Sequence, residues 1–324
     1  MEYFKKVLSL FLRVSISLLL LYFLFRQVEI DALAEIIRGA DKPLLFLAFL
    51  VFFFCHAFCL FRWEMLLRAL KIRLPLKRVI ISFSGGAFFS LFLPSTIGGD
   101  LMRSVDLAAH TKKPKEIIAT VLLDRLSGFV GLVVLCLLSL AFGWELLKDR
   151  SVFLSLGLIT AVLSAILIVL FNKSVYGIVN RLLHSPDSGK IRQLIKSLHD
   201  EIHIFRHHKR VIINNLLLSV VIQAISPLTV YIIALSLGIK VSIVYFFIFV
   251  PIIGAITLLP ISIGGLGLRD ATMIFFFAKA GLGKDISFAI SLLNFFIILM
   301  WGVIGGFIYV LTIRHRRIQH HKAP

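Results

Sequence analysis

The stretch Leu93-Pro-Ser-Thr-Ile-Gly-Gly-Asp-Leu-Met-Arg103 occurs a second time, 166 residues later, as Leu259-Pro-Ile-Ser-Ile-Gly-Gly-Leu-Gly-Leu-Arg269. Six of the eleven positions are identical. A proline lacks the N–H that a helix needs and a glycine pair loosens the backbone, so each copy predicts a broken helix. The breaks are expected at Pro94, Gly98 and Gly99 in the first copy and at Pro260, Gly264 and Gly265 in the second.

These breaks lie in a chain that is otherwise strongly apolar. Of its 324 residues, 59% are hydrophobic and 30 are Phe, and the mean hydropathy is +0.98. A soluble domain of this size could not bury so much apolar surface, so an all-α polytopic membrane protein is predicted. Irregular backbone at membrane depth survives only where it is buried in protein or lines a wet cavity. Paired interruptions in corresponding halves therefore point to the binding site of a transporter.

The formal net charge of +18 predicts contact with the anionic cytoplasmic leaflet and not with nucleic acid. Basic residues that flank membrane spans follow from the positive-inside bias. No basic globular domain is predicted that could present a patch for nucleic acid. The cysteines Cys55, Cys59 and Cys136 lie in apolar runs without a CxxC pair, so buried free thiols are expected.

Six apolar runs are long enough to cross a bilayer, at about 20 residues each. They are 7–25, 43–61, 117–142, 152–171, 211–237 and 286–313. Two further apolar stretches, 79–93 and 243–259, end at the two Pro-Gly-Gly signatures. Each is followed by a polar, helix-prone segment that can turn back. The sequence therefore predicts two re-entrant broken-helix hairpins in addition to about six full spans.

The distribution of Lys and Arg favours this layout, because basic residues concentrate in cytoplasmic loops. With the N-terminus in the cytoplasm, 23 Lys and Arg residues fall inside and 8 outside. If the two shorter stretches crossed completely, the basic loop 173–210 would face outward. We therefore predict a multi-pass protein of the cell (cytoplasmic) membrane with both termini in the cytoplasm. The hairpin of 79–93 then enters from the inside and that of 243–259 from the outside.

A single integral membrane domain, 1–324, is expected to be built as an inverted-topology repeat. Repeat 1 covers about 5–143 and repeat 2 about 151–313, with a cytoplasmic basic insertion at 172–210. Three spans separate the two hairpins, and this odd number makes their topology inverted.

Arg103 and Arg269 occupy the same position after the two breaks and are the leading candidates for binding an anion. A charged residue inside a membrane costs about 2.5 to 3.5 kcal/mol and needs a partner or a function. The helices are expected to restart after Gly99 and Gly265, where their first N–H groups are unpaired. An arginine about one turn further on adds a forked donor that fits phosphate oxygens.

The carboxylates near these arginines leave two interpretations open. Asp100 and Asp270 either take part in binding a substrate or pair with Arg103 and Arg269 and only close the hairpins, and Asp106 is a further partner for Arg103. Asp124 and Arg125, in the third span, raise the same question. Adjacent helical residues point about 100° apart, so each is expected to pair with another helix, and one such pair joins Asp124 to Arg103. A structural ion pair and a substrate-binding role are equally compatible with the sequence.

No metal or cofactor site is predicted. His199, His203 and His207 share a helical stripe, but the His-Glu-x-x-His motif and an acidic or Cys ligand set are missing. A solvated helix on the membrane surface explains this stripe better. His56, alone in the second span, is expected to be a packed core residue. No phosphate-binding loop with a Lys and no Ser elbow occurs, so the chain is not expected to be an enzyme.

Three motifs in succession resemble the transmembrane region of lysylphosphatidylglycerol synthases and their stand-alone flippase-like relatives. They are the two Pro-Gly-Gly signatures and, between them, Leu122-Leu-Asp-Arg-Leu-Ser-Gly128. In that family the membrane region is associated with moving a modified phospholipid between leaflets, while a soluble domain attaches the amino acid. This chain ends at Pro324 without such a domain, so the resemblance implies the translocation half.

The family pattern is similar to this sequence at a defined set of positions. They are Pro94, Gly98, Gly99, Asp100, Arg103, Arg125, Pro260, Gly264, Gly265, Gly267 and Arg269. Where the family commonly has Glu, this chain has Asp124 and Asp270. The charge is kept and the reach of the side chain is shorter.

The resulting hypothesis is a flippase-like transporter that moves an anionic or phosphate-bearing lipid, including aminoacylated or lipid-linked forms, between leaflets. One rival is a membrane subunit that recruits a soluble lipid-modifying synthase through the basic loop. The other is an intramembrane enzyme acting on a lipid phosphate, with Asp100, Asp124 or Asp270 as acid or base. The sequence leaves the lipid, the direction and energy source of transport and the oligomeric state open. The pattern Gly302-Val-Ile-Gly-Gly306 suits helix packing within one chain or between chains.

Overall fold

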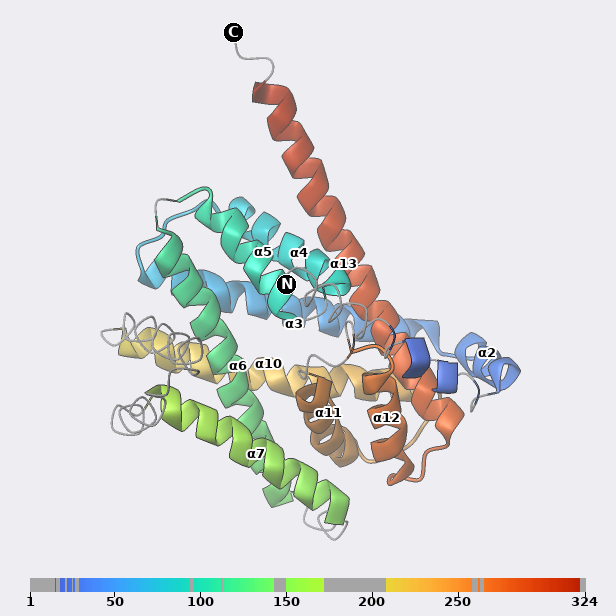
Figure 1. Cartoon of the computed structure of the whole chain (residues 1–324). Coiled ribbons are helices and arrows are strands. Elements are labelled where there is room, and N and C mark those ends of the chain that lie inside the picture. The colour runs from blue at the N-terminus through green and yellow to red at the C-terminus, as the bar shows by residue number, and fades with distance from the viewer. Residues whose placement is uncertain are drawn as a thin grey trace. The chain divides into compact units, whose positions relative to one another are not determined.

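The computed structural model describes a helical framework (Figure 1). It covers residues 29–93, 96–111, 113–142, 150–171, 208–257 and 265–320, together with Ser262 and several residues between 15 and 26. Within these residues every regular element is a helix, which confirms the predicted all-α class.

Four helices of the described part are long and apolar enough to cross a membrane. They are α3 (Lys42–Ala69), α6 (Pro114–Phe142), α10 (Lys209–Ser236) and α13 (Lys284–His320, apolar through Thr312). Helix α7 (Arg150–Phe171) covers a fifth predicted span. Most of the predicted first span, 7–25, lies outside the described residues. The chain is thus a multi-pass integral membrane protein, and the total of six spans stays a prediction.

Helix α3 differs from the predicted span 43–61 at its end. It continues for two further turns to Ala69, and Leu66 and Leu67 in these turns are buried against other helices. Arg62 and Arg68, which follow the predicted span, therefore belong to the helix and not to a loop. Both lie in the helix, and Arg62 is buried.

A break in the helix is confirmed at each Pro-Gly-Gly signature. Helix α4 (Leu76–Phe92) precedes the first break and α5 (Thr96–Ala108) follows it. Helix α11 (Ile243–Thr257) precedes the second break and α12 (Leu268–Ala278) follows it. We refer to α4–α5 as the first hairpin and to α11–α12 as the second. The break is the tip of each hairpin and the opposite end is its base.

The first hairpin folds back on itself. At its base, Nη2 of Arg78 on α4 lies 2.5 Å from Oδ1 of Asp106 on α5. Halfway along, a Cβ on Gly86 would lie 2.8 Å from the carbonyl oxygen of Gly99. The start of α4 therefore lies beside the end of α5, and the two helices are antiparallel.

The second hairpin is antiparallel as well and is held by aromatic rings. Phe246 and Phe249 on α11 lie against Phe277 on α12, with ring centroids 4.9 and 5.5 Å apart. At the tip, a Cβ on Gly265 would lie 3.6 Å from Thr257. The bases of both hairpins thus bring the entering and leaving chain together, as the re-entrant prediction requires. Their position in a membrane stays a prediction.

The chain divides into two compact units. Unit 1 consists of Met1–Ala57, Pro75–Asp106 and Ile225–Pro324, and unit 2 of Phe58–Leu74 and Leu107–Ala224. The boundary falls inside α3 and α10, and each unit takes segments from both predicted repeats. Both hairpins belong to unit 1.

Helix α13 packs against α4 of the first hairpin within unit 1. Its glycines permit close contact, since a Cβ on Gly305 would lie 2.6 Å from the carbonyl oxygen of Ser84 and one on Gly302 would collide with Leu91. Further along α13, the ring of Tyr309 covers Gly85. The two helices are antiparallel, and the glycine pattern of α13 serves packing within the chain.

Helix α13 also packs against α12 of the second hairpin, with its N-terminal half. Phe288 and Ala289 of α13 form a core to which Ala271 and Ile274 of α12 contribute. The amphipathic helix α2 (Ile30–Arg38) adds its buried Leu33 to the same core. The base of the second hairpin therefore lies near the start of α13, whereas the base of the first lies near its other end.

Unit 2 contains α6, α7, the end of α3 and the first half of α10. Helices α6 and α7 pack along each other. Leu66 on α3 joins Ala119 and Leu123 on α6 in a buried cluster, and Ile212 of α10 packs against it. A Cβ on Gly131 of α6 would lie 2.8 Å from the backbone of Ser219, so α6 and α10 are in close contact.

Candidate functional site

Arg103 lies on α5, in the first hairpin, and only 5% of it is exposed. Its Nη2 is 3.0 Å from Oδ1 of Asp100, one turn earlier on the same helix. Its guanidinium carbon lies 5.7 Å from the centroid of the Phe83 ring on α4. The Asp100 side chain keeps 18% of its surface exposed, so this ion pair is buried mainly on the arginine side.

The expected restart of the helix after Gly99 is wrong for the first hairpin. Helix α5 already begins at Thr96, so both glycines lie in its first turns. A Cβ on Gly98 would come within 2.5 Å of the Leu93 side chain, and one on Gly99 would collide with Gly86. These glycines allow α5 to approach α4, and the arginine follows in the second turn of the helix.

The second break has a different backbone. Gly265 and Gly267 have φ of +77°, the left-handed region that glycine adopts without strain, and α12 begins only at Leu268. The residue equivalent to Gly267 in the first copy is Leu101, for which such a φ is unfavourable. This difference explains why one helix starts before its glycine pair and the other after it. Arg269 therefore stands in the first turn of α12.

Arg269 is part of a closed network at the start of α12. It donates from Nη2 to Oδ1 of Asp270 at 2.9 Å and from Nε to Oγ of Ser291 on α13 at 3.2 Å. Asp270 is fully buried and also accepts the N–H of Gly267 at 2.9 Å. Phe295 of α13 lies under the guanidinium at 5.1 Å. Asp270 thus caps the helix and neutralises the arginine, which is the arrangement expected of a pair that closes a hairpin.

The two breaks approach the middle of the apolar part of α13 from opposite ends. The tip of the first hairpin reaches α13 where Leu91 meets Gly302, and Arg269 of the second lies over Phe295. The midpoint of Lys284–Thr312 is Ile298. At about 1.5 Å per residue, Gly302 lies about 6 Å to one side of it along the helix axis and Phe295 about 4.5 Å to the other.

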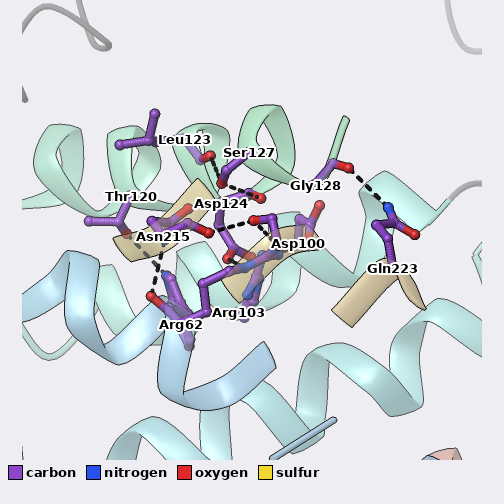
Figure 2. Close-up of polar contacts among 12 residues, drawn as sticks. Arg62, Asp100, Arg103, Thr120, Leu123, Asp124, Ser127, Gly128, Asn215 and Gln223 are labelled. Atoms are coloured by element: carbon purple, nitrogen blue, oxygen red, sulfur yellow. Dashed lines mark hydrogen bonds and ion pairs between the residues drawn. The ribbon is translucent and has the colours of Figure 1, made fainter. Parts of the chain in front are cut away.

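Asp124 forms a buried ion pair in unit 2 with a residue that sequence analysis missed. Nε of Arg62, on α3, donates to Oδ1 of Asp124 on α6 at 2.7 Å, and 8% and 6% of the two side chains are exposed (Figure 2). Nη1 of Arg62 donates to Oγ of Ser219 on α10 at 2.8 Å. Arg62 therefore joins three helices of this unit.

Other polar groups support the same helix contacts. Trp63 donates its indole N–H to Thr120 at 3.1 Å. Gln223 donates to the carbonyl oxygen of Gly128 at 2.9 Å (Figure 2). Asn215 donates to the carbonyl oxygen of Arg62 at 3.4 Å. A polar residue within an apolar span was the available signal for Asn215 and Gln223. Arg62 was missed because a charge after an apolar run was taken as the end of the span.

The remaining predicted site residues have three outcomes. Arg125 is half-buried on α6. Pro94, Pro260 and Gly264 lie outside the described residues, as do the loop 172–207 and its histidines. Cys55 and Cys136 are buried thiols outside any disulfide, as predicted, whereas Cys59 is only half-buried. His56 is likewise half-buried, so the prediction of a packed core residue was wrong. Among the described residues no group of three or more His, Cys, Asp or Glu side chains could hold a metal ion.

The chemistry that this arrangement offers is the binding of an anion by a guanidinium. Each arginine has five N–H donors, and the pair with its neighbouring carboxylate does not use them all. Arg103 and Arg269 each have a carboxylate and an aromatic face beside them. Each site is thus close to neutral without a ligand, which lowers its cost inside a membrane.

Comparison with known proteins agrees with this architecture. A UPF0104 membrane protein of Methanothermobacter thermautotrophicus is 26% identical over 297 residues, which cover 83% of this chain and 86% of the relative. A UPF0104 membrane protein of Pyrococcus horikoshii is 22% identical over 338 residues, covering 97% and 98% of the two chains. The family model described as the lysylphosphatidylglycerol synthase TM region matches residues 10–306. The chain belongs to the lysylphosphatidylglycerol synthase transmembrane region family.

Proposed function

We propose that this protein is a flippase-like transporter that moves an anionic or phosphate-bearing lipid between the leaflets of the cell membrane. The observation that carries the proposal is the approach of two broken hairpins to the middle of α13 from its opposite ends. Backbone that breaks at mid-span is tolerated only when buried or beside a wet cavity. Paired breaks of this kind mark the substrate sites of transporters built from inverted repeats.

The proposed topology has about six spans and two re-entrant hairpins, with both termini in the cytoplasm. The base of the first hairpin lies beside Tyr309, near the C-terminal end of α13. The sequence continues with Arg314, Arg316 and Arg317, and the positive-inside bias assigns this end to the cytoplasm. The second hairpin, based at the start of α13, then enters from the outside. Alternating access would expose the region around the two tips to one leaflet at a time.

In the proposed site, Arg103 and Arg269 hold the phosphate of the headgroup. Arg103 is the stronger candidate for binding the phosphate, because its partner Asp100 is partly exposed and a ligand can displace it. Asp270 acts as a positioning residue that fixes the guanidinium of Arg269 against α13. A forked guanidinium binds phosphate oxygens in a bidentate manner, which lysine does not.

The structure gives less support to an intramembrane enzyme. Asp270 is fully buried and already accepts three hydrogen bonds, from Arg269, Ser291 and the N–H of Gly267. Asp124 is paired with a buried arginine at 2.7 Å. A general acid or base has to reach the group that it protonates. Recruitment of a soluble synthase would depend on the loop 172–210, most of which lies outside the described residues.

The test is leaflet exchange of fluorescent anionic phospholipids in proteoliposomes. Each ion pair is replaced by amides of similar shape, Arg103→Gln with Asp100→Asn and Arg269→Gln with Asp270→Asn, so that no buried carboxylate is left alone. We expect exchange by the wild type and loss of exchange in both double variants, with Arg103→Lys intermediate. The control Arg68→Gln with Glu64→Gln removes an ion pair whose arginine is 70% exposed and should leave exchange unchanged. Wild-type rates in both double variants would refute the site.

A further inference from the structure

Unit 2 contains a partly open cavity of about 190 Å³ between α6 and α10. It is lined by Leu123, Ser127 and Val130 of α6 and by Ile212, Asn215 and Leu216 of α10. The hydroxyl of Ser127 donates to the carbonyl oxygen of Leu123 at 2.6 Å, and Nδ2 of Asn215 donates to that of Arg62 at 3.4 Å. The surface that faces the cavity is almost entirely apolar.

An apolar cavity of this size fits an apolar occupant. A cavity of about 150 Å³ lined by apolar side chains stays dry and binds benzene. If a methylene group takes about as much space as a water molecule, about 30 Å³, then 190 Å³ holds about six methylene groups. Side chains that line an empty space lose dispersion contacts, and a hydrocarbon chain in the cavity restores them.

The cavity lies next to the lipid-facing surface of α10. Ile213 and Leu217 directly follow the lining residues Ile212 and Leu216 in the sequence, and they are 56% and 63% exposed. Because α10 is long and apolar enough to cross a membrane, its exposed apolar side chains face acyl chains. The hydrocarbon available to this cavity is therefore the acyl chain of a membrane lipid.

The end of unit 2 at which both helices begin is positively charged. Ile212 packs against the cluster that contains Leu123, and Ser219 lies against Gly131 further along, so α6 and α10 run parallel. The exposed charged residues at their starts are all basic, and Glu116 beside them is half-buried; the basic ones are Lys113, Lys115, Lys209 and Arg210. This end is complementary to an anionic headgroup.

Lys209 has the helical register that a headgroup over the cavity requires. Lys209, Ile212 and Leu216 are spaced i, i+3 and i+7, so they lie on one stripe of α10. The two lining residues follow Lys209 by about 4.5 and 10.5 Å along the helix axis. Arg210 shares its stripe with the exposed Ile213 and Leu217 instead. An acyl chain that starts from a phosphate at Lys209 thus leads into the cavity.

We propose that unit 2 binds a phospholipid with an anionic headgroup, whose phosphate lies at Lys209 and one of whose acyl chains fills the cavity between α6 and α10. Basic residues beside a cleft between membrane helices are typical of sites for anionic lipids. The site uses none of the residues of the two hairpins. The bound lipid stays in place as part of the contact between α6 and α10, and the proposal does not depend on the transport function.

The experiment is photo-crosslinking of the purified full chain in detergent micelles. Phosphatidylserine and phosphatidylcholine probes carry the same chains, with a diazirine in the upper half of one of them, and differ in the net charge of the headgroup. The labelled residues are identified by mass spectrometry of peptides. Lys209→Gln is compared with its neighbour Arg210→Gln, and Leu216→Trp, which fills the cavity, with its neighbour Leu217→Trp. Val130→Phe fills the cavity from α6.

We expect the phosphatidylserine probe to label residues within 123–130 and 212–216 of the wild type about fivefold more than the phosphatidylcholine probe. This is the factor that one lysine near the headgroup supplies, at about 1 kcal/mol. Lys209→Gln should remove the preference and Arg210→Gln should keep it. Leu216→Trp and Val130→Phe should lose the label in these segments, and Leu217→Trp should retain it.

Three results would overturn the proposal. They are a wild type without label in both segments, a preference that survives Lys209→Gln, and a label that survives both cavity-filling variants. The variant Arg103→Gln with Asp100→Asn, which changes the first hairpin, should be labelled like the wild type. Loss of the label in that variant would identify the bound lipid as the transported one and contradict a separate site.

Discussion

The buried ion pair between Arg62 and Asp124 offers the sharpest test of how this protein is held together. At 2.7 Å, with 8% and 6% of the side chains exposed, the two groups attract each other by about 6 kcal/mol at an effective dielectric constant of about 20. Most of this is offset by the desolvation of both charges. Removing one partner alone leaves the other charge buried without its neutralising group, and this destabilises the folded protein by about 3 to 5 kcal/mol.

We therefore expect Arg62→Met and Asp124→Leu each to destabilise the protein by about 3 to 5 kcal/mol. The double variant replaces the pair by apolar side chains and should lie within about 2 kcal/mol of the wild type, since such replacements are often neutral. Arg68 and Glu64 provide the control on the same helix. Their closest atoms are 2.6 Å apart and the arginine is 70% exposed, but only 9% of the Glu64 side chain is exposed. Arg68→Met is therefore combined with Glu64→Gln, which leaves no buried carboxylate without its partner, and this control should cost about 1 kcal/mol or less.

The measurement is reversible unfolding in detergent micelles, followed by tryptophan fluorescence, for the wild type and the four variants. Single substitutions that cost no more than the control at Arg68 and Glu64, or a double variant at Arg62 and Asp124 whose loss equals the sum of the single losses, would refute the argument. Lipid exchange by the double variant separates the two roles of Asp124. A folded double variant that still moves lipid makes Asp124 structural, and a folded but inactive one gives it a direct role in transport.

Three further outcomes are expected. Gly305→Ala should destabilise the protein by about 1 to 3 kcal/mol, because its Cβ would lie 2.6 Å from the carbonyl oxygen of Ser84. Gly254→Ala, whose Cβ would have no atom within 4 Å, should be neutral or stabilising. Equal melting temperatures of the two variants would contradict this expectation. Asp270→Ala should lower the free energy of unfolding by about 3 to 5 kcal/mol, because it leaves the buried Arg269 unpaired. Asp41→Ala, which removes an exposed cap of α3, should lower it by about 1 kcal/mol. A smaller loss for Asp270 than for Asp41 in thermal unfolding would disprove its closing role. An impermeant maleimide should label cysteines at the two ends of each hairpin from one side, the inside for the first and the outside for the second, in a background without native cysteines. The positions are Arg73 and Lys113 for the first hairpin and Ser242 and Gly283 for the second; labelling of one pair from opposite sides would show a full crossing.

The breaks and most helices could be predicted from the sequence because their causes are local. Proline and paired glycines interrupt a helix wherever they occur, and runs of about 20 apolar residues form helices in a membrane. Helices α10 and α13 each begin two residues before the span that the sequence predicts for them. The end of α3 was missed because its cause is tertiary. Arg62 can stay in the helix only because Asp124 and Ser219 meet it from other helices.

The residues of the candidate site could be found from the repeat, but their roles could not. The two arginines are equivalent in sequence, yet one lies in the second turn of α5 and the other in the first turn of α12. A single difference, Leu101 in the first copy against Gly267 in the second, permits the left-handed turn in only one of them. The pairing of Arg269 with Asp270 was among the open alternatives, while the contact with Ser291 depends on how α13 packs and leaves no mark in the sequence.

The carboxylates beside both arginines bear on the proposed mechanism. A transport site has to bind its substrate well enough to be entered and weakly enough to be left. An isolated guanidinium in a membrane would hold a phosphate tightly, whereas Asp100 and Asp270 compete with the phosphate for the same donors. Because Asp100 is partly exposed and Asp270 is fully buried, the first hairpin can exchange its carboxylate for a headgroup more easily than the second. The two halves would then share a motif but have different roles, with the first hairpin exchanging its carboxylate for the ligand and the second holding its guanidinium in a fixed position.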